Sequence, residues 1–360
     1  MSKGENGSGS ASSPFEELRT KYSKDWPAIT GARLLTVRRF RDLEPIEELS
    51  SDNTAVVVFG SFARGELTSG SDIDWSLLID GPSDPAHLRV AQEVRRVLAE
   101  LNLPEPGTTE TFGTLASSHE LIHHIGGLRD TNQNMTRRIL LLLESRAITN
   151  EIVLDRVVRG ILNRYIAETS ISWRGRPDVV VPRFLLNDIV RFWRTMAVDY
   201  AAKRWEQSDK KWALRNAKLR MSRKLLFVAG LLICFSFELN PPADRDDIVS
   251  DAATMPPKLS DFFLGQMRLT PIDLLSQALL RTDRAETVAD VMDSYDAFLA
   301  LLGDEANRQH LEDLKFDDAR DDEIFERVRA LSHSFQRGLT DIFFNGDDML
   351  RNLVVKYGVF

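Results

Sequence analysis

The sequence predicts an α+β protein, in which a small mixed-sheet core is followed by a large all-helical region. Short apolar runs rich in β-branched residues lie near the N-terminus, whereas apolar residues beyond about residue 130 recur every three or four positions, as in amphipathic helices. The length of 360 residues suits two domains, or one domain with a helical extension. We therefore predict a disordered tail or tag at 1–14, a core with N-terminal helices at 15–130 and a helical domain at 131–360.

The N-terminal part is predicted to hold two helices within 15–50, with breaks at Trp26-Pro27 and Thr30-Gly31. The run from Thr54 to Phe59 is apolar and β-branched, and Gly60 ends it, as expected of a buried strand. The remaining elements predicted here are a second strand at 72–79, a helix at 87–101 packed on the sheet and a threonine-rich third strand at 108–115.

Everything beyond residue 130 is predicted to be helical. Apolar stripes at 154–165 and 185–200 indicate two of these helices, and Thr270-Pro271 is a typical capped start of another. The loop 240–247 and the pair Pro256-Pro257 are predicted linkers.

The composition excludes several classes of protein. With 43% hydrophobic and 28% charged residues, the chain resembles an average globular protein. The single cysteine, Cys234, excludes a disulfide framework and any multi-cysteine metal site. The longest apolar run, Leu225 to Phe235, is about half a membrane span and predicts a buried core helix. Because the first residues are small and polar, we expect no signal peptide, no membrane partner and a cytoplasmic protein.

The net charge of −8 is unevenly distributed along the chain. The stretch from Lys203 to Lys224 carries nine basic and two acidic residues, whereas the chain from Leu225 onward carries 13 basic and 25 acidic ones. A broadly acidic surface repels phosphate backbones, so the protein is not expected to bind duplexes in general. The basic stretch could still hold a triphosphate or a short single strand.

The most informative stretch is Gly-Ser-Phe-Ala-Arg-Gly-Glu-Leu-Thr-Ser-Gly-Ser-Asp-Ile-Asp at 60–74. Gly60 would let a backbone N–H approach a phosphate at the end of the strand, and Ser61 adds a hydroxyl donor. Asp72 and Asp74 are two apart on the predicted strand, so their carboxylates would share one face. Paired carboxylates repel each other unless a cation lies between them, and their hard oxygen atoms suit Mg²⁺. This combination is what phosphoryl or nucleotidyl transfer needs.

The stretch resembles the signature of the polymerase-β-like nucleotidyltransferase superfamily, in which Gly-Ser is followed by ten residues and Asp-x-Asp. Its Ala-Arg-Gly after the serine is similar to bacterial minimal and regulatory nucleotidyltransferases. The resemblance implies that Asp72 and Asp74 hold Mg²⁺, with Mn²⁺ as the alternative. It also implies that Gly60 and Ser61 contact the β- and γ-phosphates. For Arg64 two roles stay open, neutralising phosphate charge or holding the loop.

The resemblance further implies a third carboxylate, which would bind the catalytic metal and take the proton of the attacking hydroxyl. Glu110 is the first choice, because it alternates correctly within 109–112, and Glu105 and Asp130 are the other candidates. If none of them fills this role, the chain is a degenerate domain that binds nucleotide and signals through its helices.

Two basic segments are candidates for binding the triphosphate. Arg191 and Arg194 lie off the apolar stripe of the helix at 185–200, which is similar to the helix that places a basic residue over the triphosphate in oligonucleotide synthases and poly(A) polymerases. The basic stretch from Lys203 to Lys224 is the second candidate and contributes Arg215, Lys218 and Arg220, with Trp205 and Trp212 available to stack on a base. The alternative interpretation of both segments is a solvated helix face.

A rival motif, His-Glu-Leu-Ile-His at 119–123, matches the zinc-peptidase helix. The third ligand position holds Arg129, and Gly126-Gly127 would end the helix too early, so we predict a short surface helix rather than a zinc site. The loop 130–134 is predicted to cap a helix at 136–145, and it could also meet the ribose.

These patterns together predict metal-dependent transfer of a nucleoside monophosphate from an NTP or dNTP to an acceptor hydroxyl, with release of pyrophosphate. The acceptor is either a nucleotide, giving an oligonucleotide or second messenger, or a protein side chain. The basic stretch favours the first, and the Ala-Arg-Gly variant favours the second. The sequence predicts no oligomeric state.

Overall fold

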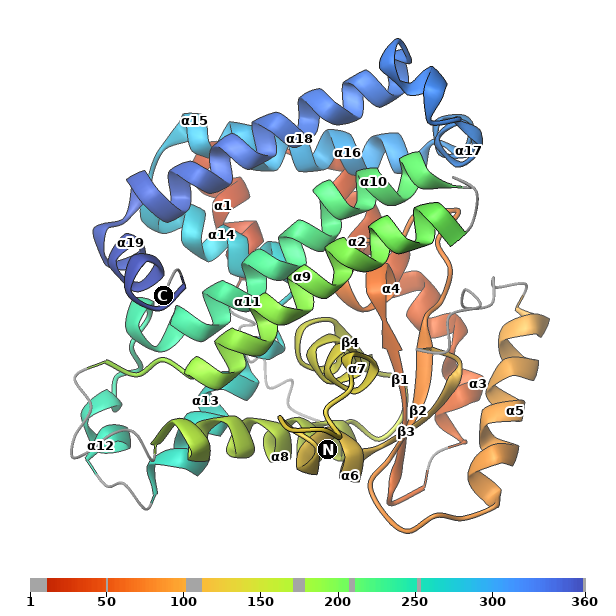
Figure 1. Cartoon of the computed structure of the whole chain (residues 1–360), viewed down its shortest axis with the longest axis vertical. Coiled ribbons are helices and arrows are strands. Elements are labelled where there is room, and N and C mark those ends of the chain that lie inside the picture. Colours follow the sequence, from red (N-terminus) through yellow and green to blue (C-terminus); the bar gives the residue numbers. More distant parts are fainter. Residues whose placement is uncertain are drawn as a thin grey trace, which may run out of the picture.

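A four-stranded sheet lies against a larger body of helices (Figure 1). The computed structural model describes residues 12–49, 51–101, 112–170, 179–206, 211–250 and 254–358. The predicted α+β class is confirmed. None of the helices in these ranges has both the length and the apolar character needed to cross a membrane.

The strands are β1 (Thr54–Phe59), β2 (Trp75–Ile79), β3 (Thr114–Ser117) and β4 (Ser145–Ala147), in the sheet order β3-β2-β1-β4. β1 is antiparallel to β2 and β4, and β3 is parallel to β2, so the sheet is mixed as predicted. The expectation that everything beyond residue 130 is helical is wrong, because β4 completes the sheet from that region. A strand of three residues is too short to show an alternating pattern in the sequence.

Both faces of β1 are covered, which explains its continuous apolar run. Val56 and Val58 pack in a core with α3 (Glu44–Glu47) and α5 (Ala86–Glu100). Ala55 and Val57 face the opposite way, into the core of the helical body. α5 buries Ala91, Val94, Val97 and Leu98, so the helix predicted at 87–101 is confirmed within one residue at each end.

Two predicted strands begin later than expected. β2 starts at Trp75, and Asp72 to Asp74 come directly before it, where the carbonyl of Asp74 accepts a hydrogen bond of 2.8 Å from the Phe59 N–H. β3 starts at Thr114, and residues 108–111 of the predicted strand lie outside the described residues.

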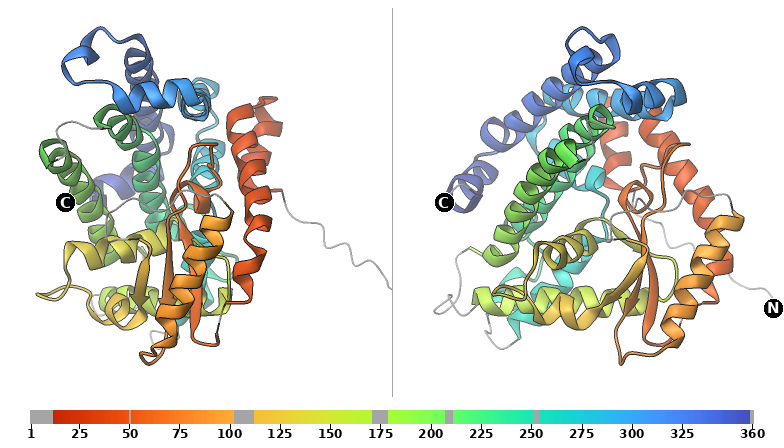
Figure 2. Two further views of the ribbon diagram at one scale, coloured as in Figure 1. Left: turned by 90° about the vertical axis from the view of Figure 1, so that its right-hand side faces the viewer. Right: turned by 45° about the vertical axis from the view of Figure 1, so that its right-hand side comes forward.

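The N-terminal helices α1 (Pro14–Tyr22) and α2 (Pro27–Asp42) pack on the C-terminal part of the helical body (Figure 2). α1 contacts α14 (Pro271–Thr282), and α2 contacts α16 (Ser294–Gly303). The indole N–H of Trp26 donates to Asp293 Oδ1 at 2.8 Å. The predicted break at Trp26-Pro27 is confirmed, whereas Thr30-Gly31 lies inside α2, since one glycine costs a packed helix only about 1 kcal/mol.

The apolar run predicted as a core helix is α11, which buries most of its residues, including Cys234. Pro256 and Pro257 are not in a linker but in the first turn of α13, where the missing proline N–H leaves no hydrogen bond unmade. The helices from the sheet onward are α4 (Gly60–Arg64), α6 (Ser118–His123), α7 (Asn132–Leu143), α8 (Glu151–Ser170), α9 (Arg183–Glu206), α10 (Trp212–Arg220), α11 (Ser222–Leu239), α12 (Arg245–Val249), α13 (Met255–Met267), α15 (Ala285–Val288), α17 (Glu305–Asp313), α18 (Glu323–Asp341) and α19 (Asp348–Leu353).

Candidate functional site

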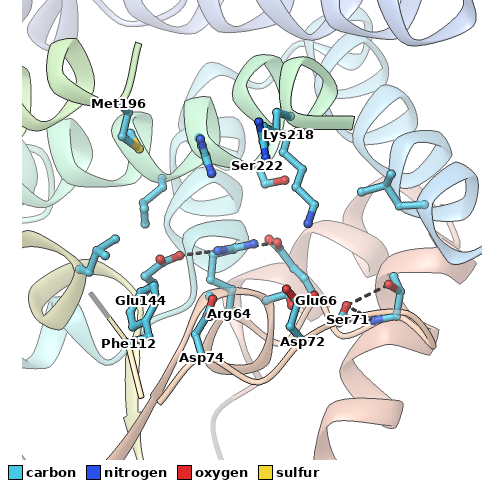
Figure 3. Close-up of a pocket in the computed structure, with 18 of the residues that line it drawn as sticks. Arg64, Glu66, Ser71, Asp72, Asp74, Phe112, Glu144, Met196, Lys218 and Ser222 are labelled. Carbon is cyan, nitrogen blue, oxygen red and sulfur yellow. Dashed lines mark hydrogen bonds and ion pairs between the residues drawn. The ribbon is translucent and has the colours of Figure 1, made fainter. Parts of the chain in front are cut away.

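A cavity of about 290 Å³ lies between the sheet and the helical body, and residues of the signature stretch line one wall of it (Figure 3). This central cavity brings together five of the predicted site residues from 60–74, and Lys218 lies in the opposite wall. The five are Gly60, Ser61, Arg64, Asp72 and Asp74. The facing residues come from α9, α10, α11 and α17 and include Met196, Arg215, Lys218, Ser222, Arg223 and Arg308.

Gly60 fixes the backbone at the end of β1. Its φ of +66° lies in the left-handed region, and a Cβ placed there would be 3.1 Å from Oδ2 of Asp74. The turn therefore needs glycine twice, for its conformation and for the close approach of the Asp74 carboxylate. α4 begins at Gly60 and ends at Gly65, whose φ of +73° is also left-handed.

Changing Gly60 to alanine is expected to lower the free energy of unfolding by about 1–2 kcal/mol, because of the left-handed φ, and to displace Asp74. Urea denaturation measures the change. The control is Gly31→Ala in α2, where an added Cβ meets nothing within 4 Å and the helix should gain stability. Equal effects of the two substitutions would contradict this account of Gly60.

Asp72 and Asp74 lie at the entry to β2 with their carboxylates in the central cavity. Burial, together with the charges of Asp72 and Glu144, raises the pKa of Asp74 to about 6. This concentration of negative charge on hard oxygen ligands fits a divalent cation such as Mg²⁺, which would relieve the repulsion. Within the described ranges no three His, Cys, Asp or Glu side chains are grouped to hold a metal ion.

Arg64 is bound between two buried carboxylates. Its Nε donates to Glu66 Oε2 at 2.8 Å, and its Nη1 donates to Glu144 Oε2. The three side chains are 11%, 3% and 7% exposed in the order Arg64, Glu66 and Glu144. Of the two roles left open by the sequence, this geometry favours holding the loop. Glu144 was missed, although a carboxylate directly after the apolar run 139–143 is the kind of signal that indicates a buried partner.

The predicted third carboxylate, Glu110, and its alternative Glu105 lie outside the described residues. The other alternative, Asp130, is not among the residues that line the central cavity. Its two carboxylate oxygens each accept a hydrogen bond of 3.1 Å from Arg138. Burial alone would raise the pKa of Asp130, but the hydrogen bonds from Arg138 and Gly126 lower it.

The wall opposite the aspartates is basic. Arg308 places Nη2 at 3.6 Å from Asp72 Oδ1 and lies against the backbone of Gly70, where a Cβ would be 2.9 Å from its Nε. Burial and the nearby Arg308 lower the pKa of Lys218 to about 8, and burial also lowers the pKa of Arg223. Neither Lys218 nor Arg223 has a hydrogen bond or ion pair within the described part of the chain. Two partly buried cations thus point at space large enough for an anion.

Arg308 and Arg223 were not singled out from the sequence. Arg308 lies in an acidic, amphipathic segment more than 230 residues from the motif, and nothing local distinguishes it. Two neighbours of Lys218 do not line the cavity. Trp212 is buried between Phe316 and Phe325 and donates to the Leu314 carbonyl at 2.6 Å, so it cannot stack on a base, and Arg220 Nε donates to Asn216 Oδ1 at 2.6 Å. The side chain of Trp205 lies outside the described residues.

Arg191 and Arg194 are not brought to the aspartates. Phe192, Met196 and Tyr200, spaced by four, form the side of α9 that lines the central cavity. The two arginines belong to a neighbouring side of the same helix and line a separate groove.

The histidine motif forms the short helix predicted for it. α6 ends at His123, and Gly126 and Gly127 follow with φ of +76°. The predicted cap of the next helix is also confirmed, since the Thr131 hydroxyl accepts from the Asn134 N–H at 3.1 Å, although α7 starts at Asn132, four residues earlier than expected.

The mixed sheet and the signature loop agree with the result of a comparison with known families. Residues 43–108 match the family model of the nucleotidyltransferase domain. This part of the chain, which spans β1, the loop and β2, is therefore a nucleotidyltransferase domain, consistent with the polymerase-β-like superfamily. A search of the curated proteins found no match.

Proposed function

We propose that the protein is a metal-dependent nucleotidyltransferase, which moves a nucleoside monophosphate from an NTP or dNTP to an acceptor hydroxyl. The observation that carries the proposal is the charge arrangement in the central cavity. A carboxylate pair lies on one wall, and Lys218 and Arg223 lie on the other without hydrogen-bond partners among the described residues. A triphosphate with a divalent cation complements both walls.

In this proposal Asp72 and Asp74 hold Mg²⁺ or Mn²⁺, which when bound neutralises charge on the phosphates. Gly60 and Ser61 contact the β- and γ-phosphates from the end of β1. Lys218, Arg223 and Arg308 pair with the remaining phosphate oxygens. Arg64 acts through Glu66 and Glu144, by keeping the loop in place.

The transfer itself is a displacement at the α-phosphorus. The acceptor oxygen forms a bond to the α-phosphorus. The bond between the α-phosphorus and the oxygen that bridges to the β-phosphate breaks, and pyrophosphate leaves. The hydroxyl proton passes to a carboxylate, and Glu110 remains our prediction for it.

Product analysis tests the proposal. The purified protein is incubated with each ribo- and deoxyribonucleoside triphosphate and Mg²⁺ or Mn²⁺, beside an Asp72→Ala/Asp74→Ala control. Pyrophosphate release that the control lacks is the expected result. Label in small products indicates a nucleotide acceptor, and label on protein indicates modification of a side chain. Binding without release from any donor would mean either that the acceptor is a macromolecule missing from the assay or that the protein is a nucleotide-binding regulator, and the second would overturn the proposal.

A further inference from the structure

A second groove, of about 350 Å³, runs along α9 next to the central cavity. We call it the α9 groove. Asn187, Arg191, Arg194 and Thr195 line it from one side of the helix, and Asn132 at the start of α7 lines it from the other wall. Asp199 lines both this groove and the central cavity, so the two spaces lie next to each other at that residue. A molecule lying in the groove would therefore point one end towards the proposed transfer site.

A network of hydrogen bonds and ion pairs forms the floor of the α9 groove. Arg191 donates to Asp130 Oδ2 at 3.1 Å, to the Asp130 carbonyl at 3.0 Å and to Asn132 Oδ1 at 3.2 Å. Beneath it, the completely buried Arg138 donates to both oxygens of Asp130 and, at 2.7 Å, to Asp188 Oδ2. Because buried ion clusters contribute little net stability, we infer that the role of this cluster is to fix the positions of its side chains. It holds the Arg191 guanidinium and the Asn132 amide in fixed positions at the groove.

Free hydrogen-bond donors line the groove beside this floor. Arg194 is exposed and has no hydrogen bond or ion pair with any residue in the described ranges, and the same holds for the side chains of Asn187 and Thr195. A guanidinium binds phosphate oxygens, and amide and hydroxyl groups bind sugars and base edges. The side of α9 from Asn187 to Asp199 is about 18 Å long, which corresponds to roughly five stacked nucleotides.

We propose that the α9 groove binds the acceptor and that the acceptor is a short single-stranded oligonucleotide. Its terminal hydroxyl enters the central cavity at Asp199, and Arg194 pairs with one of its phosphates. The inference rests on the proposed transferase function and names the acceptor class for it. It also assigns Arg191 and Arg194 to the acceptor rather than to the donor triphosphate.

Two binding measurements on the full-length protein test the inference. Fluorescence anisotropy with fluorescein-labelled RNA pentamers of A and of U reports acceptor binding. Calorimetry with the α,β-methylene analogue of the donor and Mg²⁺ reports donor binding. Arg194→Glu is expected to weaken pentamer binding at least about tenfold and to reduce the slope of log K against log salt by about 0.7, the value for one lost phosphate contact. Donor binding is expected to stay unchanged.

The matched control is Arg89→Glu, an exposed arginine on α5 that lines neither space and should leave both measurements unchanged. Equal pentamer affinity in wild type and Arg194→Glu overturns the inference, as does an equal loss in the control. Loss of donor binding in Arg194→Glu also overturns it, because the arginine then serves the triphosphate. A wild type that binds the donor but neither pentamer overturns the inference and leaves the transferase standing, whereas failure to bind the donor overturns both.

Discussion

Replacement of Asp74 by asparagine is expected to reduce nucleotidyl transfer by at least about 10³-fold, because it removes a proposed metal ligand, while the fold stays intact. The carboxylate of Asp74 lies near those of Asp72 and Glu144, and burial with these like charges raises the pKa of Asp74 to about 6. Removing this charge relieves repulsion, so the variant without metal should be at least as stable as wild type. Turnover assays and thermal unfolding in the absence of divalent cations measure the two effects.

The pH dependence of stability gives a second test of the same substitution. Because the pKa of Asp74 in the folded protein is above its ordinary value of 3.8, the folded state binds this proton more tightly than the unfolded state. The contribution of Asp74 to the free energy of unfolding therefore falls as pH rises from about 4 to about 6. Asp74→Asn should lack this fall in the free energy of unfolding, whereas the exposed control Asp52→Asn should keep both the fall and full activity.

Near-full activity of Asp74→Asn would contradict the assignment of Asp74 as a metal ligand.

Replacement of Arg64 by methionine is expected to lower the free energy of unfolding by about 3–5 kcal/mol. The guanidinium is the shared ion-pair partner of Glu66 and Glu144, and the change leaves two nearly buried carboxylates close together without the cation that is hydrogen-bonded to both. Urea denaturation at neutral pH measures the loss. Arg39→Met is the control, because its ion pair with Asp42 is about half exposed on both sides and should matter by less than about 0.5 kcal/mol.

Acid should partly rescue the Arg64 variant. Without the arginine, burial and the nearby charge of Glu66 raise the pKa of Glu144 further, so the stability of the variant falls as pH rises through the raised pKa of Glu144. The triple variant Arg64→Met/Glu66→Gln/Glu144→Gln should recover most of the loss, because the two carboxylates that lost their shared partner no longer carry a charge. A triple variant no more stable than Arg64→Met would show that the arginine stabilises by packing alone.

The local part of the site was predictable from the sequence, and the part built by tertiary contacts was not. The positions of Gly60, Asp72 and Asp74 are set by a strand end and a short loop, and the residues that form them are close together in the sequence. Arg308 reaches the same cavity only because α17 folds over Gly70, and no periodicity records that contact.

The sequence pattern of a helix also predicts less than the tertiary structure shows. The apolar stripe of α9 correctly indicated that Arg191 and Arg194 point away from the core, but it could not show which space they line. β4 escaped prediction because its three residues gain their strand conformation from pairing with β1.

The contact of α1 and α2 with α14 and α16 has a consequence for the way the chain is made. The Phe15 N–H donates to Asp273 Oδ1, and the N–H groups of Ala28 and Ile29 donate to Asp296 Oδ1. On a ribosome adding 5–20 residues per second, these partners emerge roughly 13–54 s after the N-terminal helices. Until then the apolar faces of α1 and α2 stay exposed to solvent, so a chaperone that binds nascent chains has a long interval in which to act on them.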